Sequence, residues 1–210
     1  MAAGLTRLGR RLLGALRLDP AAAADVASDP AAGAEAAAVV LLATAATAVG
    51  RIESLRVVPL VAALPIAAIG WAVWLAVATT ATARLVRAPA TRDVGARLRA
   101  LAFAAAPALV ETLGMLPLLR PWAVLVGEAG IVLAGVIAIR TAFAAGSTSR
   151  VFAASLAAWI ARVGVMLILV AALRPLLVSR IRASRAHPAT VPTAGYLGVV
   201  KPSGIAPPEE

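Results

Sequence analysis

The sequence has 210 residues, of which 61% are hydrophobic, and it carries a formal net charge of +10. Its mean hydropathy of +0.92 is far above that of soluble domains, which are roughly half apolar, so we predict an integral membrane protein. The chain contains no cysteine, which excludes disulfides, zinc-thiolate sites, iron–sulfur clusters and cysteine nucleophiles.

The basic residues lie between the apolar runs and are almost all arginine, with Lys201 the only lysine. Basic loops between apolar segments are typical of membrane proteins, whose cytoplasmic loops are rich in arginine and lysine. We therefore expect no nucleic-acid partner, although a charge of this size in a soluble protein would suggest one. The bias towards alanine and arginine indicates GC-rich coding and favours a bacterial cytoplasmic membrane.

Residues 4–18 are predicted to form an amphipathic helix within a cytoplasmic segment, residues 1–30. At about 100° per residue the leucines share one face: Leu5, Leu8, Leu12, Leu13 and Leu16. The arginines lie opposite: Arg7, Arg10, Arg11 and Arg17. Such a helix lies in the interface of an anionic membrane, with its arginines directed at the headgroup phosphates. The alternative is a surface helix that docks on a partner or on the protein's own loops.

Two Asp-Pro pairs delimit the segments around the first apolar run. Asp19-Pro20 is predicted to end the amphipathic helix, because the residue before proline is disfavoured in the α region. Asp29-Pro30 combines an N-cap residue with proline at the first helical position, so it predicts the start of the next helix.

Five apolar segments are long enough to cross a bilayer, which needs about 20 residues. We predict an all-α bundle of transmembrane helices in a membrane domain over residues 31–178, with spans at 31–50, 57–83, 100–119, 122–139 and 151–173. Pro107 lies inside the third span, and Arg120-Pro121 is predicted to form a tight turn. Residues 179–210 are basic and then rich in Pro and Gly, and we predict a disordered tail.

The distribution of arginines predicts that the N-terminus is cytoplasmic. The loops over residues 84–99 and 140–150 are basic and fall on the same side as the N-terminal segment. Five spans put the C-terminal tail outside, yet arginines also follow the fifth span directly. Either the early charges dominate the orientation or the number of spans differs by one.

The order of these features resembles the YIP domain family of membrane proteins. The resemblance rests on the segment ending Leu18-Asp19-Pro20, on the stretch 92–103 leading to Pro107, and on the turn from Leu116-Pro117 to Pro121. It implies a cytosolic N-terminal part, five clustered helices and a role as a membrane scaffold. The acidic-aromatic stretch of many eukaryotic relatives is missing here, so their association with Rab-type GTPases is not carried over.

Three ionisable residues lie well inside the predicted spans: Glu111, Glu128 and Arg162. Charges at this depth cost at least a few kcal/mol, so each is a candidate functional residue. Glu111 lies nine residues before Arg120 and Glu128 eight after it, which puts both at roughly 12 Å depth in a helical hairpin. Arg162 is within reach of that level, and we predict that it pairs with one or both glutamates. The set is either a structural ion-pair cluster or a path for protons or cations.

Small and aromatic residues are assigned packing and anchoring roles. Gly130, Ala134 and Gly135 predict close helix packing. The tryptophans are predicted to act as interface anchors or packing residues: Trp71, Trp74, Trp122 and Trp159.

The sequence contains no recognisable catalytic grouping, metal site or cofactor motif, so we predict a non-enzymatic protein. The first hypothesis is a scaffold that binds the bilayer, in particular anionic headgroups, together with an unidentified protein partner or a second copy of the chain. The second is a small transporter or proton- or cation-conducting protein that uses Glu111 and Glu128.

Overall fold

The computed structural model describes residues 2–51, 57–86, 93–143 and 147–186, and within these ranges all secondary structure is helical. The chain divides into two compact units, residues 1–171 and 172–210. The elements of the described part are α1 (Ala2–Leu16), α2 (Pro20–Ser28), the 3₁₀ helix η1 (Pro30–Ala32), α3 (Gly33–Arg51), α4 (Val57–Val86), α5 (Val94–Phe103), the 3₁₀ helix η2 (Ala106–Met115), α6 (Arg120–Phe143) and α7 (Thr148–Ala186).

Aspartates begin three of the helices by accepting hydrogen bonds from backbone N–H groups of the first turn. Asp19 accepts from Ala21 at 2.9 Å, Asp29 accepts from Ala31 at 2.9 Å, and Asp93 accepts from Ala96. Each bond satisfies a donor that has no partner within the helix. The helix start predicted at Asp29-Pro30 is confirmed.

The corner between α1 and α2 contains Leu18, the one non-glycine residue of the described chain with a positive φ, at 58°. The Leu18 N–H donates to Ala15 O and the Asp19 N–H donates to Gly14 O, which is the hydrogen-bond pattern of a Schellman motif. Glycine usually occupies this position, and leucine adopts it at a cost of about 1–2 kcal/mol. The side chain of Leu18 packs against the main hydrophobic core, which offsets part of that cost.

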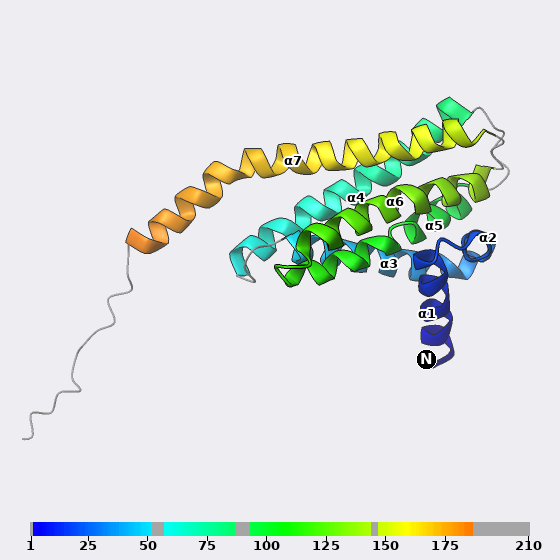
Figure 1. Cartoon of the computed structure of the whole chain (residues 1–210), viewed down its shortest axis with the longest axis horizontal. Coiled ribbons are helices and arrows are strands. Elements are labelled where there is room, and N and C mark those ends of the chain that lie inside the picture. Colours follow the sequence, from blue (N-terminus) through cyan, green and yellow to red (C-terminus); the bar gives the residue numbers. More distant parts are fainter. Residues whose placement is uncertain (1, 52–56, 87–92, 144–146, 187–210) are drawn as a thin grey trace, which may run out of the picture. The chain divides into compact units, whose positions relative to one another are not determined.

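Five helical segments are long and apolar enough to cross a membrane: Pro30–Arg51, Val61–Val86, Val94–Met115, Arg120–Phe143 and Thr148–Pro175. The predicted fold class is therefore confirmed. In Figure 1, α3, α5 and α6 lie beside one another, and α1 runs crosswise to them at one end. We refer to the end that holds α1, α2 and the first turns of α3 and α5 as the N-terminal end of the bundle.

The third segment differs from its predicted range of 100–119. It begins at Val94 because Asp93 caps α5, and it accommodates two arginines near its start. Arg99 reaches back to backbone carbonyls of Val26 and Ala27, and Arg97 lies over the Phe143 ring at 5.3 Å. The segment ends at Met115, and the turn lies at residues 116–119, one step before the Arg120-Pro121 pair that was predicted to form it.

Pro107 divides this third segment into two parts. It cannot donate a backbone hydrogen bond, and the chain changes from α5 to the 3₁₀ helix η2 at this point. A ten-residue 3₁₀ helix is unusually long, since runs beyond about 3–4 residues are uncommon. Its narrower cross-section lets η2 lie between α3 and α6.

Glycines on α3 and α6 allow η2 to approach closely. A methyl group added at Gly50 would overlap the Glu111 carbonyl oxygen, and one added at Gly130 would come within 2.6 Å of the Pro107 ring. At Gly135 it would meet Ser155 of α7. The close packing predicted for Gly130 and Gly135 is thus present in the structure.

Trp71 and Trp74 form the aromatic centre of an otherwise alanine-rich core. Both are fully buried, and their rings meet edge to face with centroids 5.7 Å apart. Of the two roles predicted for the tryptophans, these two residues therefore have the packing role. Trp122, in contrast, is exposed at the start of α6.

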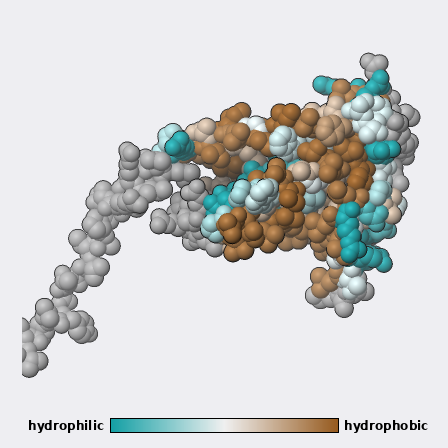
Figure 2. All heavy atoms as spheres, viewed as in Figure 1, coloured by the Kyte–Doolittle hydropathy of each residue, from teal (hydrophilic) through white to brown (hydrophobic). Residues whose placement is uncertain are grey.

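The outer surface of the bundle is apolar. Large hydrophobic side chains are exposed on every candidate span, among them Leu41, Val61, Leu113, Leu125 and Ile168. Figure 2 shows brown hydrophobic surface along the sides and teal hydrophilic residues gathered at the N-terminal end. An apolar surface of this extent indicates contact with lipid.

Of the second unit, the structure describes only the last part of α7, which continues to Ala186. Residues 179–186 are therefore helical, whereas the disordered tail was predicted from residue 179. The prediction relied on the basic composition and on the absence of an apolar period after residue 179, and neither feature excludes a helix. Residues 187–210 lie outside the described part.

Candidate functional site

Four charged residues from four elements meet inside the bundle, and we call them the charge cluster. Arg51 is the last residue of α3, Glu111 belongs to η2, Glu128 to α6 and Arg162 to α7. Sequence reasoning selected Glu111, Glu128 and Arg162. It missed Arg51, which lies one residue beyond the predicted end of the first span.

Glu128 is the centre of the charge cluster. Its carboxylate accepts two hydrogen bonds from Arg162 Nη1, at 3.0 and 2.8 Å, and one from Trp159 Nε1 at 2.6 Å. Arg51 Nη2 donates to the same carboxylate. Two guanidinium groups and an indole therefore share one acceptor group, and the hydrogen bonds from the guanidinium groups are charge-assisted.

Glu111 is fully buried and is held by Arg51 alone among the described residues. Arg51 Nε lies 3.0 Å from Oε2, and Arg51 Nη2 lies 3.4 Å from Oε1. The same guanidinium thus bridges Glu111 and Glu128, which places the two carboxylates on either side of one cation. Arg162 makes no hydrogen bond to Glu111, so of its two predicted partners it contacts Glu128.

Arg162 is 0% exposed and lies over the face of Trp71, 4.2 Å from the ring centroid. Its Nη2 also approaches Thr47 Oγ1 at 3.4 Å. Nε has no hydrogen-bond partner within the described residues. The cation is thus stabilised by Glu128 on its edge and by the aromatic ring on its face.

The two arginines and two glutamates of the charge cluster carry opposite charges that cancel. Removing charges from water is unfavourable unless they are paired and hydrogen-bonded, and here each one is. Arg51, at 30% side-chain exposure, is the only member with substantial access to the surface of the described structure. Beside it, a cavity of about 150 Å³ is lined by Thr47 and by apolar residues of α4 and α7.

A second set of charges holds α1 to the bundle, and we call it the N-terminal clamp. Arg11 Nε binds Asp25 at 2.8 Å, Nη2 binds Asp29 at 2.8 Å and Nη1 binds Glu35 at 2.7 Å. The three carboxylates come from α2, from the cap of η1 and from α3. Arg7 adds weaker contacts to Asp29 and Glu35.

The N-terminal clamp alters the protonation of its members. The hydrogen bond with Asp25, followed by those with Asp29 and Glu35, raises the pKa of Arg11 against the opposing effect of burial. The hydrogen bond from Arg11, together with that from the Ala31 N–H, holds the pKa of Asp29 below its ordinary value. Arg11 occupies the space between these carboxylates. Among the described residues, no group of acidic or histidine side chains is arranged to bind a metal ion.

Arg11 was predicted to face lipid with the other arginines of α1, and the structure shows that it does not. It is 4% exposed and its donors are directed at carboxylates, so it is unavailable to headgroup phosphates in this structure. Arg10 and Arg17 are exposed, as a membrane-facing role requires, whereas Arg7, although exposed, also contacts Asp29 and Glu35 of the N-terminal clamp. Sequence periodicity put all four arginines on one face and could not show that acids from three later segments converge on one of them.

The leucine face of α1 is also divided. Leu8 and Leu12 pack on a small core with Val26, Val39 and Phe103. The other leucines of the face are exposed: Leu5, Leu13 and Leu16. Docking on the protein, which was the alternative prediction for this helix, thus accounts for one half of the face and leaves the other half uncovered.

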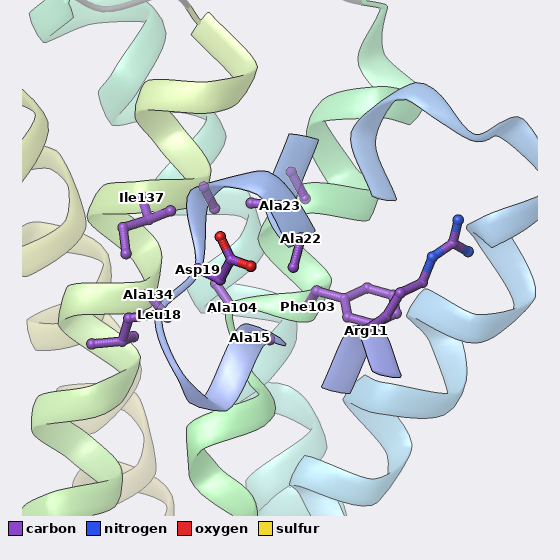
Figure 3. Close-up of a pocket in the computed structure, with 12 residues that line it drawn as sticks. Arg11, Ala15, Leu18, Asp19, Ala22, Ala23, Phe103, Ala104, Ala134 and Ile137 are labelled. Atoms are coloured by element: carbon purple, nitrogen blue, oxygen red, sulfur yellow. The ribbon is translucent and has the colours of Figure 1, made fainter. Parts of the chain in front are cut away.

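Figure 3 shows the corner between α1 and α2 above α5 and α6, with the Arg11 guanidinium directed away from the small pocket beside Asp19. The pocket holds about 20 Å³ and is lined mainly by alanines, with Leu18 and Ile137. That volume accommodates about one water molecule, so the pocket is no site for an organic ligand.

Comparison with protein-family models, with curated proteins and with solved structures found no match to this chain.

Proposed function

We propose that this protein is a non-catalytic, multi-pass membrane scaffold that binds anionic lipid at the membrane surface through α1. The observation that carries the proposal is the placement of α1, which is clamped crosswise to the spans while half of its leucine face remains exposed. A helix parallel to the membrane plane with uncovered leucines has the geometry of an interfacial helix.

The exposed side chains of α1 have the order that an anionic interface requires. At 100° per residue, Leu5, Leu16 and Leu13 occupy one arc, and Arg17 and Arg10 follow directly beside it. The leucines can enter the acyl boundary while the arginines stay at the level of the phosphates, each contributing about 1 kcal/mol near a charged surface. The N-terminal clamp fixes this helix to the bundle and reduces the entropy lost on binding.

The proposed orientation puts this surface in the cytoplasm. Exposed or partly exposed arginines of later segments lie at the N-terminal end too, including Arg84, Arg97, Arg140 and Arg150. The order of segments that resembles the YIP domain family fits a scaffold of this kind, and no Rab partner is part of the proposal.

The experiment places an environment-sensitive fluorophore on Leu13→Cys in the full chain, reconstituted into nanodiscs. We expect a blue shift in nanodiscs with phosphatidylglycerol relative to phosphatidylcholine, and a smaller shift for Arg10→Gln/Arg17→Gln. Raising the salt concentration should reduce the difference. Identical emission in both lipids would overturn the proposal.

One observation favours the second candidate function, conduction of protons or cations. The cavity beside Arg51 gives the charge cluster an approach from the surface, at the end of α3 opposite to the N-terminal clamp. Against conduction, both carboxylates are already neutralised by arginines. Proton or cation flux into proteoliposomes that is lost in Glu128→Gln would support this candidate, and flux equal to that of protein-free vesicles would exclude it.

A further inference from the structure

We infer that a groove between α3, α4 and α5 is a binding site for one anionic phospholipid, whose phosphate contacts Arg99. This site goes beyond the proposed role of α1, because no residue of α1 lines the groove.

The groove has the size and chemistry of an acyl-chain site. Its volume is about 570 Å³, within the range of about 300–1,000 Å³ of ligand pockets. The lining consists of small and aliphatic residues such as Ala37, Leu41 and Leu75, and Arg99 is its only charged member. All three helices are candidate spans or parts of one, so the groove faces the hydrocarbon region.

The length of the groove matches one leaflet. Its lining on α3 extends from Gly33 at the N-terminal end of the bundle to Leu41, about 12 Å along the helix at 1.5 Å per residue. Half of a hydrocarbon core about 30 Å thick is about 15 Å. A chain in this groove would therefore belong to a lipid of the leaflet on which α1 lies.

Arg99 supplies the charge that selects an anionic headgroup. Its Nη2 donates to Ala27 O at 3.0 Å and its Nε lies 3.4 Å from Val26 O, so both bonds go to neutral carbonyls. No carboxylate of the described chain forms an ion pair with it, and Asp93 uses its carboxylate to cap Ala96. Arg11, Arg51 and Arg162, in contrast, each form an ion pair with at least one acid.

The third guanidinium nitrogen of Arg99 lies beside Gly95. Nη1 lies 3.1 Å from the position that a Cβ of Gly95 would occupy, and Gly95 is itself a lining residue. The absence of a side chain at Gly95 thus leaves room for this nitrogen at the mouth of the groove. A basic group at the interfacial end of an apolar groove is the arrangement that binds anionic lipid headgroups between helices.

Native mass spectrometry of the full chain in mild detergent, titrated with phosphatidylglycerol or phosphatidylcholine, tests the inference. We expect one phosphatidylglycerol to bind in preference to phosphatidylcholine. Ala37→Phe fills the groove and should abolish this binding, whereas Ala45→Phe, on the exposed surface of α3 outside the groove, should not. Arg99→Gln should weaken it about fivefold, the contribution of one arginine, while Arg140→Gln, at the same end, should leave it unchanged.

The outcomes are separable from those for α1. Arg10→Gln/Arg17→Gln should retain the bound lipid even where it loses the fluorescence shift of α1. If Arg99→Gln does not fold, Ala37→Phe and Ala45→Phe decide the question, since both keep Arg99. Unchanged binding in Ala37→Phe, or equal binding of both lipids by the wild type, would overturn the inference.

Discussion

At the scale of single residues, Glu128 contributes most to the charge cluster. It accepts from Arg51, Trp159 and Arg162, whereas Glu111 accepts from Arg51 only among the described residues. Loss of one partner from a buried pair leaves an uncompensated charge, which costs about 3–5 kcal/mol. The two glutamates therefore differ in the consequences of their neutralisation.

A double-mutant cycle measures this difference. Arg162→Ala should destabilise the folded protein by about 3–5 kcal/mol, and adding Glu128→Gln should recover part of the loss because it removes the carboxylate that Arg162 had neutralised. Adding Glu111→Gln instead should recover less, since Glu111 has no hydrogen bond to Arg162. Unfolding in mixed micelles gives the free energies of the wild type, the three single variants and the two double variants.

Coupling between neighbours is the signature that distinguishes a shared site from separate residues. Strictly additive losses for Arg162→Ala and Glu128→Gln would contradict the geometry of the charge cluster. Equal recovery by both glutamine substitutions would show that Arg162 is shared between the two carboxylates.

Charge in an apolar run was a sufficient signal for three of the four members of the cluster. Arg51 gave no such signal, because an arginine at the end of a span normally reaches water. Its inward direction depends on η2, whose close approach to α3 at Gly50 brings Glu111 within its reach. The hydrogen bond from Trp159 to Glu128 could not be predicted either, because a tryptophan in a span is usually interpreted as an interface anchor.

At the scale of elements, the N-terminal clamp determines whether α1 stays on the bundle. The depressed pKa of Asp29 means that the folded state binds its proton less readily than the unfolded state does. Its stabilising contribution is therefore present above the ordinary pKa of about 3.9 and is lost as the pH falls through the lower folded value. Arg11 remains charged throughout this range.

We accordingly expect α1 to be held at pH 7 and at pH 5, and to be released progressively as the pH falls from the ordinary aspartate pKa of about 3.9 through the lower pKa of folded Asp29. Hydrogen exchange of the α1 amides in detergent micelles follows the release. Arg11→Gln should give fast exchange already at pH 7, while Arg10→Gln, which removes an exposed charge from the same helix, should retain the protection. Exchange in Arg11→Gln that equals the wild type would show that Leu8 and Leu12 hold α1 without the clamp.

The packing of η2 against α3 gives a prediction on glycine. Gly50→Ala places a methyl group against the Glu111 carbonyl and should destabilise the bundle by about 1–3 kcal/mol, the usual cost of overpacking. Gly9→Ala provides the control, because a Cβ there meets nothing within 4 Å and alanine favours helix. The thermal transition of tryptophan fluorescence reports both, and an unchanged midpoint in Gly50→Ala would contradict the close approach of η2.

Elements that depend on local pattern were predictable, and those that depend on packing were not. The period of residues 4–18 and the Asp29-Pro30 pair are local signals, and they predicted a helix and a helix start. The division of the leucine face, the short helix α2 and the conversion of the third span to 3₁₀ geometry after Pro107 depend on what lies beside them. Hydropathy also placed the start of that span too late, because Arg97 and Arg99 reach Phe143 and backbone carbonyls and so tolerate a position inside it.

At the scale of the whole molecule, five spans could be read from the sequence because a bilayer accepts only segments that satisfy their own backbone hydrogen bonds. The lateral order of the spans could not, since apolar faces are interchangeable until particular glycines and charges meet. The proposed orientation rests on arginines at the N-terminal end, a cumulative signal that no single contact determines.

Cysteine accessibility tests the central claim, a five-span bundle with α1 and the basic loops on its cytoplasmic face. The chain has no native cysteine, so single substitutions can be labelled without background by a membrane-impermeant reagent. In intact cells we expect Ala3→Cys, Arg92→Cys and Ser147→Cys to react only after permeabilisation. Gly195→Cys and Leu118→Cys, the latter in the turn before α6 at a residue 85% exposed, should react directly. Labelling of Ser147→Cys in intact cells with Gly195→Cys silent would contradict the account.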